Sequence, residues 1–176
     1  RGLGDVYKRQ LSLDKEPFYF EKIKAKDFFE EYTAYAADTL GEAGIEFIYN
    51  FECDEDREIN IDPAQFRRVL NNLIDNSRKY GAEDGTAKIM LSVRNGENGH
   101  TEISIEDNGQ GVPADERDKI FETFYRGDKA RTGHKNGSGL GLAITKQITD
   151  RHGASIRADE SELGGLKVII DLPQAK

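Results

Sequence analysis

The chain has 176 residues, a formal net charge of −8 and a single cysteine, Cys53. The net negative charge opposes binding to nucleic acid or to an anionic membrane, so any site for a polyanion must be local. One cysteine excludes an intrachain disulfide and a cysteine-rich metal site, and it fits a reducing compartment. No stretch approaches the ~18 apolar residues of a membrane span. We expect one domain over residues 16–176 and leave 1–15 unassigned, as a remnant or a frayed end.

Apolar spacing predicts the first elements. Residues 17–23 are expected to form a strand or an extended lead-in. A helical repeat over about 27–42 predicts a helix with Asp27 as its N-cap. Alternation over 45–51 predicts a half-buried strand, and a short strand is expected at 59–61.

The stretch from Asp62 to Tyr80 predicts one amphipathic helix. Asp62 is a good N-cap, Pro63 suits the first helical position, and Gly81 can close the helix. One apolar stripe is expected to face the core: Phe66, Val69, Leu70, Leu73 and Ile74.

A second stripe on this helix is polar, with Asn72, Asn76 and Lys79 at i, i+4 and i+7. Carboxamide oxygens one turn apart suit Mg²⁺, which prefers oxygen ligands and keeps several waters. A lysine one turn further on can meet the phosphates that the metal carries. The alternative is a solvated polar face, and the helix alone leaves both open.

The remaining elements are expected at these positions: strands at about 87–93 and 101–107 joined by a turn at 95–99, a helix at about 140–151 ended by Gly153, and strands at about 154–159 and 166–172 joined at Gly164 and Gly165. Mixed helices and an antiparallel-rich sheet predict an α+β fold, a two-layer α/β sandwich.

Asp107 stands out because the two-residue period of its strand places it on the buried face with Ile103 and Ile105. A buried carboxylate is costly unless a group donates to it. The following residues, 108–111, are Asn-Gly-Gln-Gly, which allow a close approach of ligand to backbone. Asp107 can accept from an exocyclic amino group such as that of adenine. The alternative is an Asp-Asn-Gly turn in which the carboxylate binds its own backbone.

A glycine-rich run covers residues 137–142, Gly-Ser-Gly-Leu-Gly-Leu, just before the expected helix. Glycines let backbone amides approach an anion, and the helix N-terminus adds a favourable dipole. The run matches neither the Walker loop nor the dinucleotide fingerprint. By itself it is also compatible with a flexible connection.

The segment over about 112–138 is predicted to be a lid. Phe121 and Phe124 are apolar anchors in a polar stretch that concentrates positive charge: Arg126, Lys129, Arg131 and Lys135. A basic loop over a phosphate site suits a lid that is mobile without nucleotide and ordered by a triphosphate. A solvated surface loop is the alternative.

Together, in this order, the motifs resemble the catalytic ATP-binding domain of a bacterial sensor histidine kinase, within the superfamily of gyrase, MutL and heat-shock chaperone ATPases. The resemblance covers about residues 20–173. Its boxes are Asn72-Leu-Ile-Asp-Asn76-Ser-Arg-Lys79-Tyr80, Asp107-Asn-Gly109-Gln-Gly111, Phe121-Glu-Thr-Phe124-Tyr-Arg126 and Gly137-Ser138-Gly139-Leu140-Gly141-Leu142. It implies a Bergerat-type fold, a mixed, mostly antiparallel sheet with helices packed on one face.

The resemblance also implies roles. Asp107 would accept from the adenine amino group, Asn76 would bind Mg²⁺, and Arg126 would reach the γ-phosphate of ATP. Asn72, Lys79 and Tyr80 would line the phosphate and ribose region, with Asn72, Lys79 and Arg126 as the catalytic residues. The other nucleotide-binding residues implied are Gly109, Gly111, Val112, Phe121, Gly137, Ser138, Gly139, Leu140, Gly141 and Leu142.

Asn72 bears on the reaction. Hydrolysing relatives carry a glutamate there that orients water, whereas asparagine is no base, so ATP would be held for transfer to another nucleophile. Two alternatives remain: a nucleotide-binding module without transfer, and an anti-sigma-type protein serine kinase.

The family's acceptor histidine lies on a separate dimerisation helix and is followed by an acidic residue and a proline. His100, His134 and His152 lack this context, and each is expected to be an ordinary surface or capping residue. The implied partners are ATP or ADP, the dimerisation and phosphotransfer domain, and a response regulator reached through that domain. The implied location is cytoplasmic, in a membrane-bound parent, with no membrane contact by this fragment.

Overall fold

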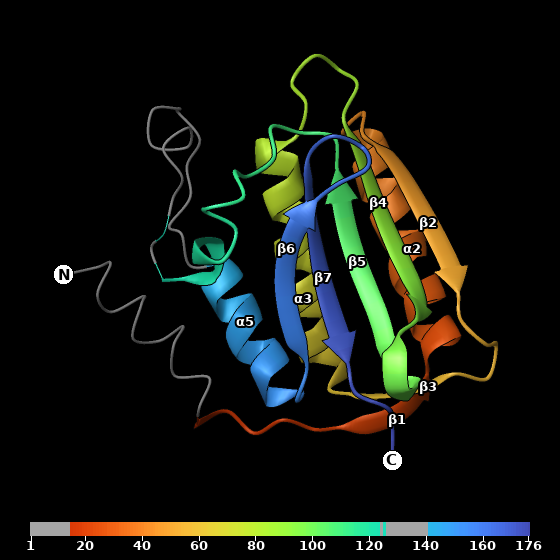
Figure 1. Ribbon diagram of the computed structural model, residues 1–176. Helices are drawn as coiled ribbons and strands as arrows, with labels where there is room; N and C mark the ends of the chain where they lie inside the picture. Colours follow the sequence, from red (N-terminus) through yellow and green to blue (C-terminus); the bar gives the residue numbers. More distant parts are fainter. Residues whose placement is uncertain (1–14, 124, 126–140) are drawn as a thin grey trace.

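The computed structural model describes residues 15–123, 125 and 141–176 (Figure 1). A five-stranded sheet has the order β2 (Glu46–Glu52), β4 (Lys88–Asn95), β5 (Thr101–Asp107), β7 (Leu166–Leu172) and β6 (Ser155–Glu160). β2 runs parallel to β4, and the other neighbours pair antiparallel. The helices α2 (Ala25–Glu42), α3 (Pro63–Tyr80) and α5 (Gly141–Arg151) cover one face of this sheet (Figure 1). The predicted α+β two-layer sandwich is confirmed.

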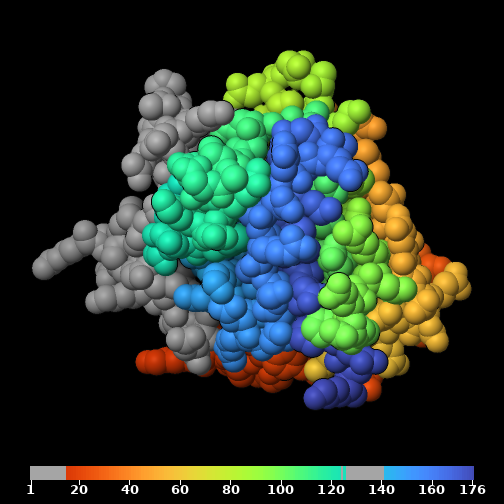
Figure 2. Space-filling model, viewed as in Figure 1, coloured from red at the N-terminus to blue at the C-terminus, as the bar shows by residue number. Residues whose placement is uncertain are grey.

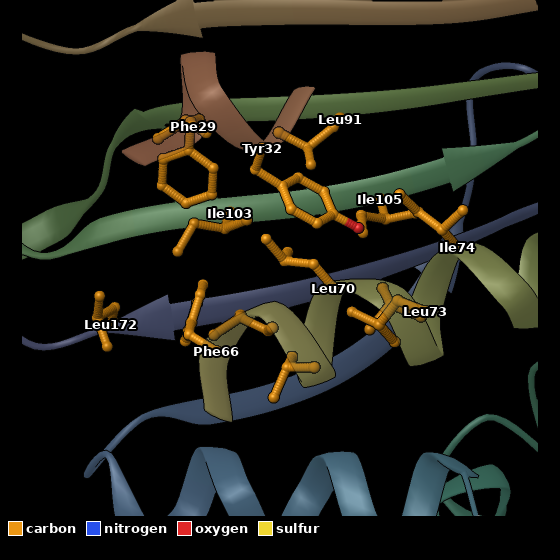
Figure 3. Close-up of a cluster of buried hydrophobic side chains, with 14 of the residues drawn as sticks. Phe29, Tyr32, Phe66, Leu70, Leu73, Ile74, Leu91, Ile103, Ile105 and Leu172 are labelled. Atoms are coloured by element: carbon orange, nitrogen blue, oxygen red, sulfur yellow. The ribbon is translucent and has the colours of Figure 1, made fainter. Parts of the chain in front are cut away.

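Helix α3 is the element that the sequence predicts best. The Asp62 side chain caps it by accepting from the Gln65 amide at 3.0 Å, and Pro63 occupies the first position. The predicted apolar stripe is buried and packs under β4, β5 and β7 (Figure 3). Each such fully buried side chain contributes about 1.5–3 kcal/mol relative to exposure.

Gly81 ends α3 in a different way from the one predicted. Its φ of −72° is not left-handed, so the glycine is not a Schellman-type cap. A Cβ at this position would lie 2.6 Å from the Ser77 carbonyl oxygen, which explains why glycine is needed. The reason is close backbone approach rather than a special φ angle.

Helix α2 begins earlier than predicted, and Asp27 is not its cap. The N-cap is Lys24, which makes no capping bond with its side chain, and Asp27 lies in the first turn. Instead, the Ala25 amide donates to the Arg57 carbonyl at 2.9 Å. The small sheet of β1 (Glu21–Lys24) and β3 (Glu58–Ile61) brings these groups together, so tertiary pairing sets the start of the helix.

His152 is buried, so its predicted place on the surface is wrong, whereas the capping role is confirmed, because its ring bonds to a carbonyl of the last turn of α5. Its ring packs against Phe18, Phe20 and Phe66. Nε2 accepts from the Asp62 amide at 3.1 Å, while Nδ1 lies 2.8 Å from the Ile148 carbonyl oxygen. Burial lowers the pKa of His152, so the neutral ring is favoured.

The β4–β5 hairpin forms as predicted, with the short helix η2 (Glu97–Gly99) in its turn. At the strand ends His100 lies 2.8 Å from Asp171 through its Nδ1 atom. Residue 134 lies outside the described part of the chain. Over the described ranges, no helix has both the length and the apolar character that a membrane crossing requires.

Candidate nucleotide site

Asp107 ends β5 and is only 3% exposed, as the alternation predicts. Its Oδ1 atom accepts from the Gly109 amide at 3.0 Å and from the Leu166 amide at 3.2 Å. The first of these bonds is the local turn considered as an alternative, so that turn is present. Both amides use Oδ1, and the Ser77 side chain also bonds to this carboxyl group. A carboxylate offers about four acceptor positions, so it can still accept from a further donor. The turn and a ligand-accepting carboxylate are therefore compatible.

Two opposing influences act on the pKa of Asp107. Burial raises it above the ordinary range, because the charged form loses water. Hydrogen bonds from the Gly109 and Leu166 amides and from the Ser77 side chain lower it, and burial prevails. The site thus holds a carboxylate that gains from an additional donor.

Glycines surround Asp107 where backbones meet. A Cβ at Gly109 would collide with the Tyr80 carbonyl oxygen, and a Cβ at Gly165 would collide with Asp107 Oδ1. Gly111 has a φ of +68°, which favours glycine. These positions allow three segments to close around one carboxylate: the end of α3, the loop after β5 and the β6–β7 turn.

The loop after β5 is tied down on both sides. The Gln110 amide donates to the Tyr80 carbonyl at 3.2 Å, which joins this loop to the end of α3. The Asn108 side chain accepts from the Lys88 amide at 2.8 Å and donates to the Thr86 carbonyl at 2.7 Å. The proposed base-binding residues and the C-terminal end of α3 therefore form one connected unit.

Three residues at Asp107 escaped the sequence analysis: Ser77, Gly165 and Leu166. Ser77 is buried one position after Asn76, and a serine on the apolar side of α3 is a signal that could have found it. Gly165 was predicted only as part of a turn. Leu166 acts through its backbone amide, which no side-chain pattern reveals.

The polar stripe of α3 leads from this unit toward α5. The Asn72 side chain donates to the Gly141 carbonyl and approaches Thr145 Oγ1, both at 3.4 Å. Asn76 is half-buried and Lys79 is exposed, and neither side chain forms a hydrogen bond or ion pair with another described residue. Among the described residues, a Cβ at Gly141 would meet no atom within 4 Å.

The stem of the predicted lid packs on the domain. Phe121 is buried in the short helix η3 (Lys119–Phe121), while Val112 and Leu142 are half-buried against the core. Arg117 donates to the Val112 carbonyl at 3.1 Å and lies 3.7 Å from the Asp159 carboxylate. The anchoring predicted for Phe121 is confirmed.

Several predicted site residues lie outside the described residues: Phe124, Arg126, Gly137, Ser138, Gly139 and Leu140. Their roles, and the lid's response to nucleotide, stay predictions. The described residues include no group of three or more His, Cys, Asp or Glu side chains that could hold a metal ion. A metal here would need oxygens from Asn76 and from a ligand.

Comparison with known proteins identifies the family. Residues 61–176 match the family described as histidine kinase-, DNA gyrase B-, and HSP90-like ATPase. Sensor histidine kinase WalK of Bacillus subtilis (strain 168) is 41% identical over 132 residues, which are 75% of this chain and 21% of that protein. The chain thus spans about a fifth of the length of this relative.

Solved structures share the fold. The mycobacterial sensor histidine kinase MprB superposes with a TM-score of 0.71 at 26% identity, over 89% of this chain and 98% of that one. Full-length ShkA, solved in complex with AMPPNP, superposes with a TM-score of 0.74 at 23% identity, over 92% of this chain and 32% of that one. The chain belongs to the histidine kinase-, DNA gyrase B- and HSP90-like ATPase family, as the catalytic ATP-binding domain of a sensor histidine kinase.

Proposed function

We propose that this domain, over residues 16–176, binds ATP with its adenine at Asp107. It would then transfer the γ-phosphoryl group to a histidine on a separate dimerisation domain. The observation that carries the proposal is the buried Asp107 carboxylate, whose Oδ1 is held by two backbone amides while Oδ2 can meet a ligand's amino group. The AMPPNP complex of ShkA, a structure of the same fold, supports an adenine nucleotide as ligand.

The polar stripe of α3 suits the phosphates. The Asn76 carboxamide, half-buried and without a recorded hydrogen bond in the described ranges, would be an oxygen ligand of Mg²⁺. When bound, Mg²⁺ neutralises phosphate charge. Lys79 would add a positive charge one turn beyond Asn76. Tyr80 would contact the ribose region, and Arg126, outside the described residues, would reach the γ-phosphate.

Asn72 supports transfer over hydrolysis. Its side chain donates toward Gly141 and Thr145, and a carboxamide cannot take a proton from water. Water near the γ-phosphate would therefore lack a general base at this position. We infer slow hydrolysis and little autophosphorylation by the isolated domain.

We propose three features of the parent protein from the likeness to WalK. The domain would act on the dimerisation domain of the same kinase, pass the phosphoryl group from there to a response regulator, and face the cytoplasm below a membrane-bound sensor. These partners lie beyond the fifth of the relative that this chain spans.

Phosphoryl transfer to a supplied dimerisation domain tests the proposal. The chain is incubated with ATP labelled at the γ-phosphate and with the dimerisation domain of a WalK-type kinase. We expect labelling of that domain that is lost in acid and persists in base, as for phosphohistidine. The matched control carries glutamine in place of the acceptor histidine and should remain unlabelled. Acid-stable label would indicate a serine kinase, and ADP binding without any label would indicate a binding module; either result contradicts the proposed reaction.

A further inference from the structure

Glu106 is a buried carboxylate that the proposed reaction does not use. It precedes Asp107 on β5, so strand alternation directs it to the opposite face of the sheet, the one not covered by α2, α3 or α5 (Figure 1). Nevertheless it is only 3% exposed. Burying a carboxylate is costly unless its oxygens accept hydrogen bonds or pair with a cation. The partners of Glu106 therefore show which part of the structure its side chain stabilises.

Those partners come from the β6–β7 turn and the strand after it. The Ser161 hydroxyl donates to Glu106 Oε1 at 3.0 Å, and the Lys167 ammonium lies 4.0 Å from Oε2. Ser161 is itself buried. The closer and better-directed contact is the one to Ser161, so Glu106 chiefly holds the start of the turn.

Ser161 organises the turn that follows it. Its hydroxyl accepts from the Leu163 amide at 3.0 Å, and its carbonyl accepts from the Gly164 amide at 2.9 Å. Its own amide donates to the Gly165 carbonyl at 2.9 Å. A single hydroxyl therefore links the sheet, through Glu106, to a closed turn over residues 161–165.

The far end of the same turn rests on Asp107. The Gly165 amide donates to the Asp107 carbonyl at 3.0 Å, and the Leu166 amide donates to Asp107 Oδ1 at 3.2 Å. Figure 1 shows this turn at the end of the sheet where strand β5 terminates, and Figure 2 shows the β6–β7 region (blue) beside the segment that follows β5 (teal). Glu106 and Asp107 thus both bond to the turn region over residues 161–166, and their side chains do so from opposite faces of β5.

We propose that Glu106 and Ser161 are positioning residues for base recognition, acting through the Gly165–Leu166 backbone on Asp107. The inference rests on the proposed function, because it assigns Asp107 to adenine. The Leu166 amide, together with the Gly109 amide, holds Asp107 Oδ1 and so sets the rotation of the carboxyl group and the direction of Oδ2. A hydrogen bond weakens steeply as its alignment is lost, so a loosened turn reduces the contribution of the base to affinity.

Nucleotide affinity of folded variants tests this role. Calorimetry with ADP and with GDP is carried out on the wild-type chain and on the variants Ser161→Ala and Glu106→Ala, well below their unfolding temperatures. We expect each substitution to weaken ADP about fivefold, the equivalent of one hydrogen bond, and to narrow the preference for ADP over GDP. Because Glu106 and Ser161 both act through the Leu166–Asp107 contact, the double variant should lose no more ADP affinity than either single variant.

Conservative and matched variants separate positioning from stability. Ser161→Thr keeps the hydroxyl and Glu106→Gln keeps an acceptor for it, so both should bind ADP as the wild type does. Glu102→Ala is the matched control, because Glu102 lies on the same face of β5 but pairs with Arg94 at 2.6 Å, away from the turn. It should leave ADP affinity unchanged. Hydrogen exchange at the Leu166 amide should become faster in Ser161→Ala than in the control.

Each outcome decides a different claim. If Ser161→Ala binds ADP as tightly as the wild type and protects the Leu166 amide equally, the positioning role is wrong. This holds even if Glu106→Ala fails to fold, since Ser161→Ala removes only a hydroxyl. If the wild-type chain itself does not prefer ADP over GDP, the adenine assignment fails, and with it the proposed function.

Discussion

The two ends of the candidate site are built differently. At the base end, Asp107 is buried and bonded to backbone amides, and glycines 109 and 165 leave no room for a Cβ. At the phosphate end, the side chains of Asn76 and Lys79 bond to no other described residue, and a Cβ at Gly141 would meet no described atom within 4 Å. The base end is assembled by the protein alone. The phosphate end keeps its polar groups available for a ligand.

Gly165→Ala should have the largest effect, because it breaks the base end directly. The new methyl group would overlap the Asp107 carboxylate and lie 2.6 Å from the Gly109 amide nitrogen. We expect a loss of about 3 kcal/mol in unfolding free energy from overpacking. ADP affinity should fall roughly 10- to 100-fold, as for a lost hydrogen bond to a charged group. Denaturant unfolding and calorimetry measure the two quantities.

Gly141→Ala is the matched control for this comparison. Its methyl group meets no atom of the described residues within 4 Å, and Gly141 is the first residue of α5. Alanine in a helix should raise the unfolding free energy, by up to about 0.5–1 kcal/mol. Equal destabilisation by the two substitutions would show that the ends do not differ in packing.

His152→Phe should lower stability without touching either end. The His152 ring lies between the N-terminal end of α3 and the C-terminal end of α5. Phenylalanine also places an aromatic ring there, but it leaves the Asp62 amide without an acceptor. We expect a loss of about 1–3 kcal/mol at neutral pH and an unchanged affinity for ADP. Reduced ADP affinity in the folded variant would show that the site is coupled to this distant cluster.

The pH dependence of the same variant has a defined sign. Burial lowers the pKa of His152 below its ordinary 6.5, so the folded protein binds this proton less tightly than the unfolded chain. The stability that His152 contributes is present above pH 6.5 and is lost as the pH falls toward the lower folded value. Phenylalanine should remove this component from the stability profile measured by thermal unfolding.

Asn76→Ala should affect the phosphate end alone. Because the side chain has no recorded protein partner in the described ranges, stability should stay within about 0.5 kcal/mol. The gain in affinity for a non-hydrolysable ATP analogue on adding Mg²⁺ should shrink roughly tenfold, while metal-free ADP binding is kept. An undiminished effect of Mg²⁺ would remove Asn76 from the metal site.

Asn72→Glu should change only a slow background reaction, the hydrolysis of ATP. A carboxylate beside Gly141 and Thr145 can act as a general base for water. We expect the rate of ATP hydrolysis to rise roughly tenfold, which is less than a well-placed general base contributes. Phosphate release in single-turnover assays measures it. A rate equal to that of the wild type would mean that residue 72 does not separate transfer from hydrolysis.

The predictable parts of this molecule are those that depend on local spacing. Helix α3 follows from its cap, Pro63 and its apolar stripe, and the burial of Asp107 follows from the alternation along β5. The unpredicted parts depend on contacts between distant residues. The Leu166 amide meets Asp107 across 59 positions. His152 is buried by Phe18, near the N-terminus, and by Phe66 of α3. Local patterns do not contain such pairings.

Adenine recognition by Asp107 is the central claim, and calorimetry of Asp107→Asn with ADP tests it most directly. Asparagine keeps the size of the side chain but removes the charge that accepts from the adenine amino group. We expect roughly 10- to 100-fold weaker binding. Because burial raises the pKa of Asp107, wild-type affinity should also fall as acidification protonates the carboxylate, and the variant should lack this component. Unchanged ADP affinity in the folded variant, at every pH tested, would contradict the account.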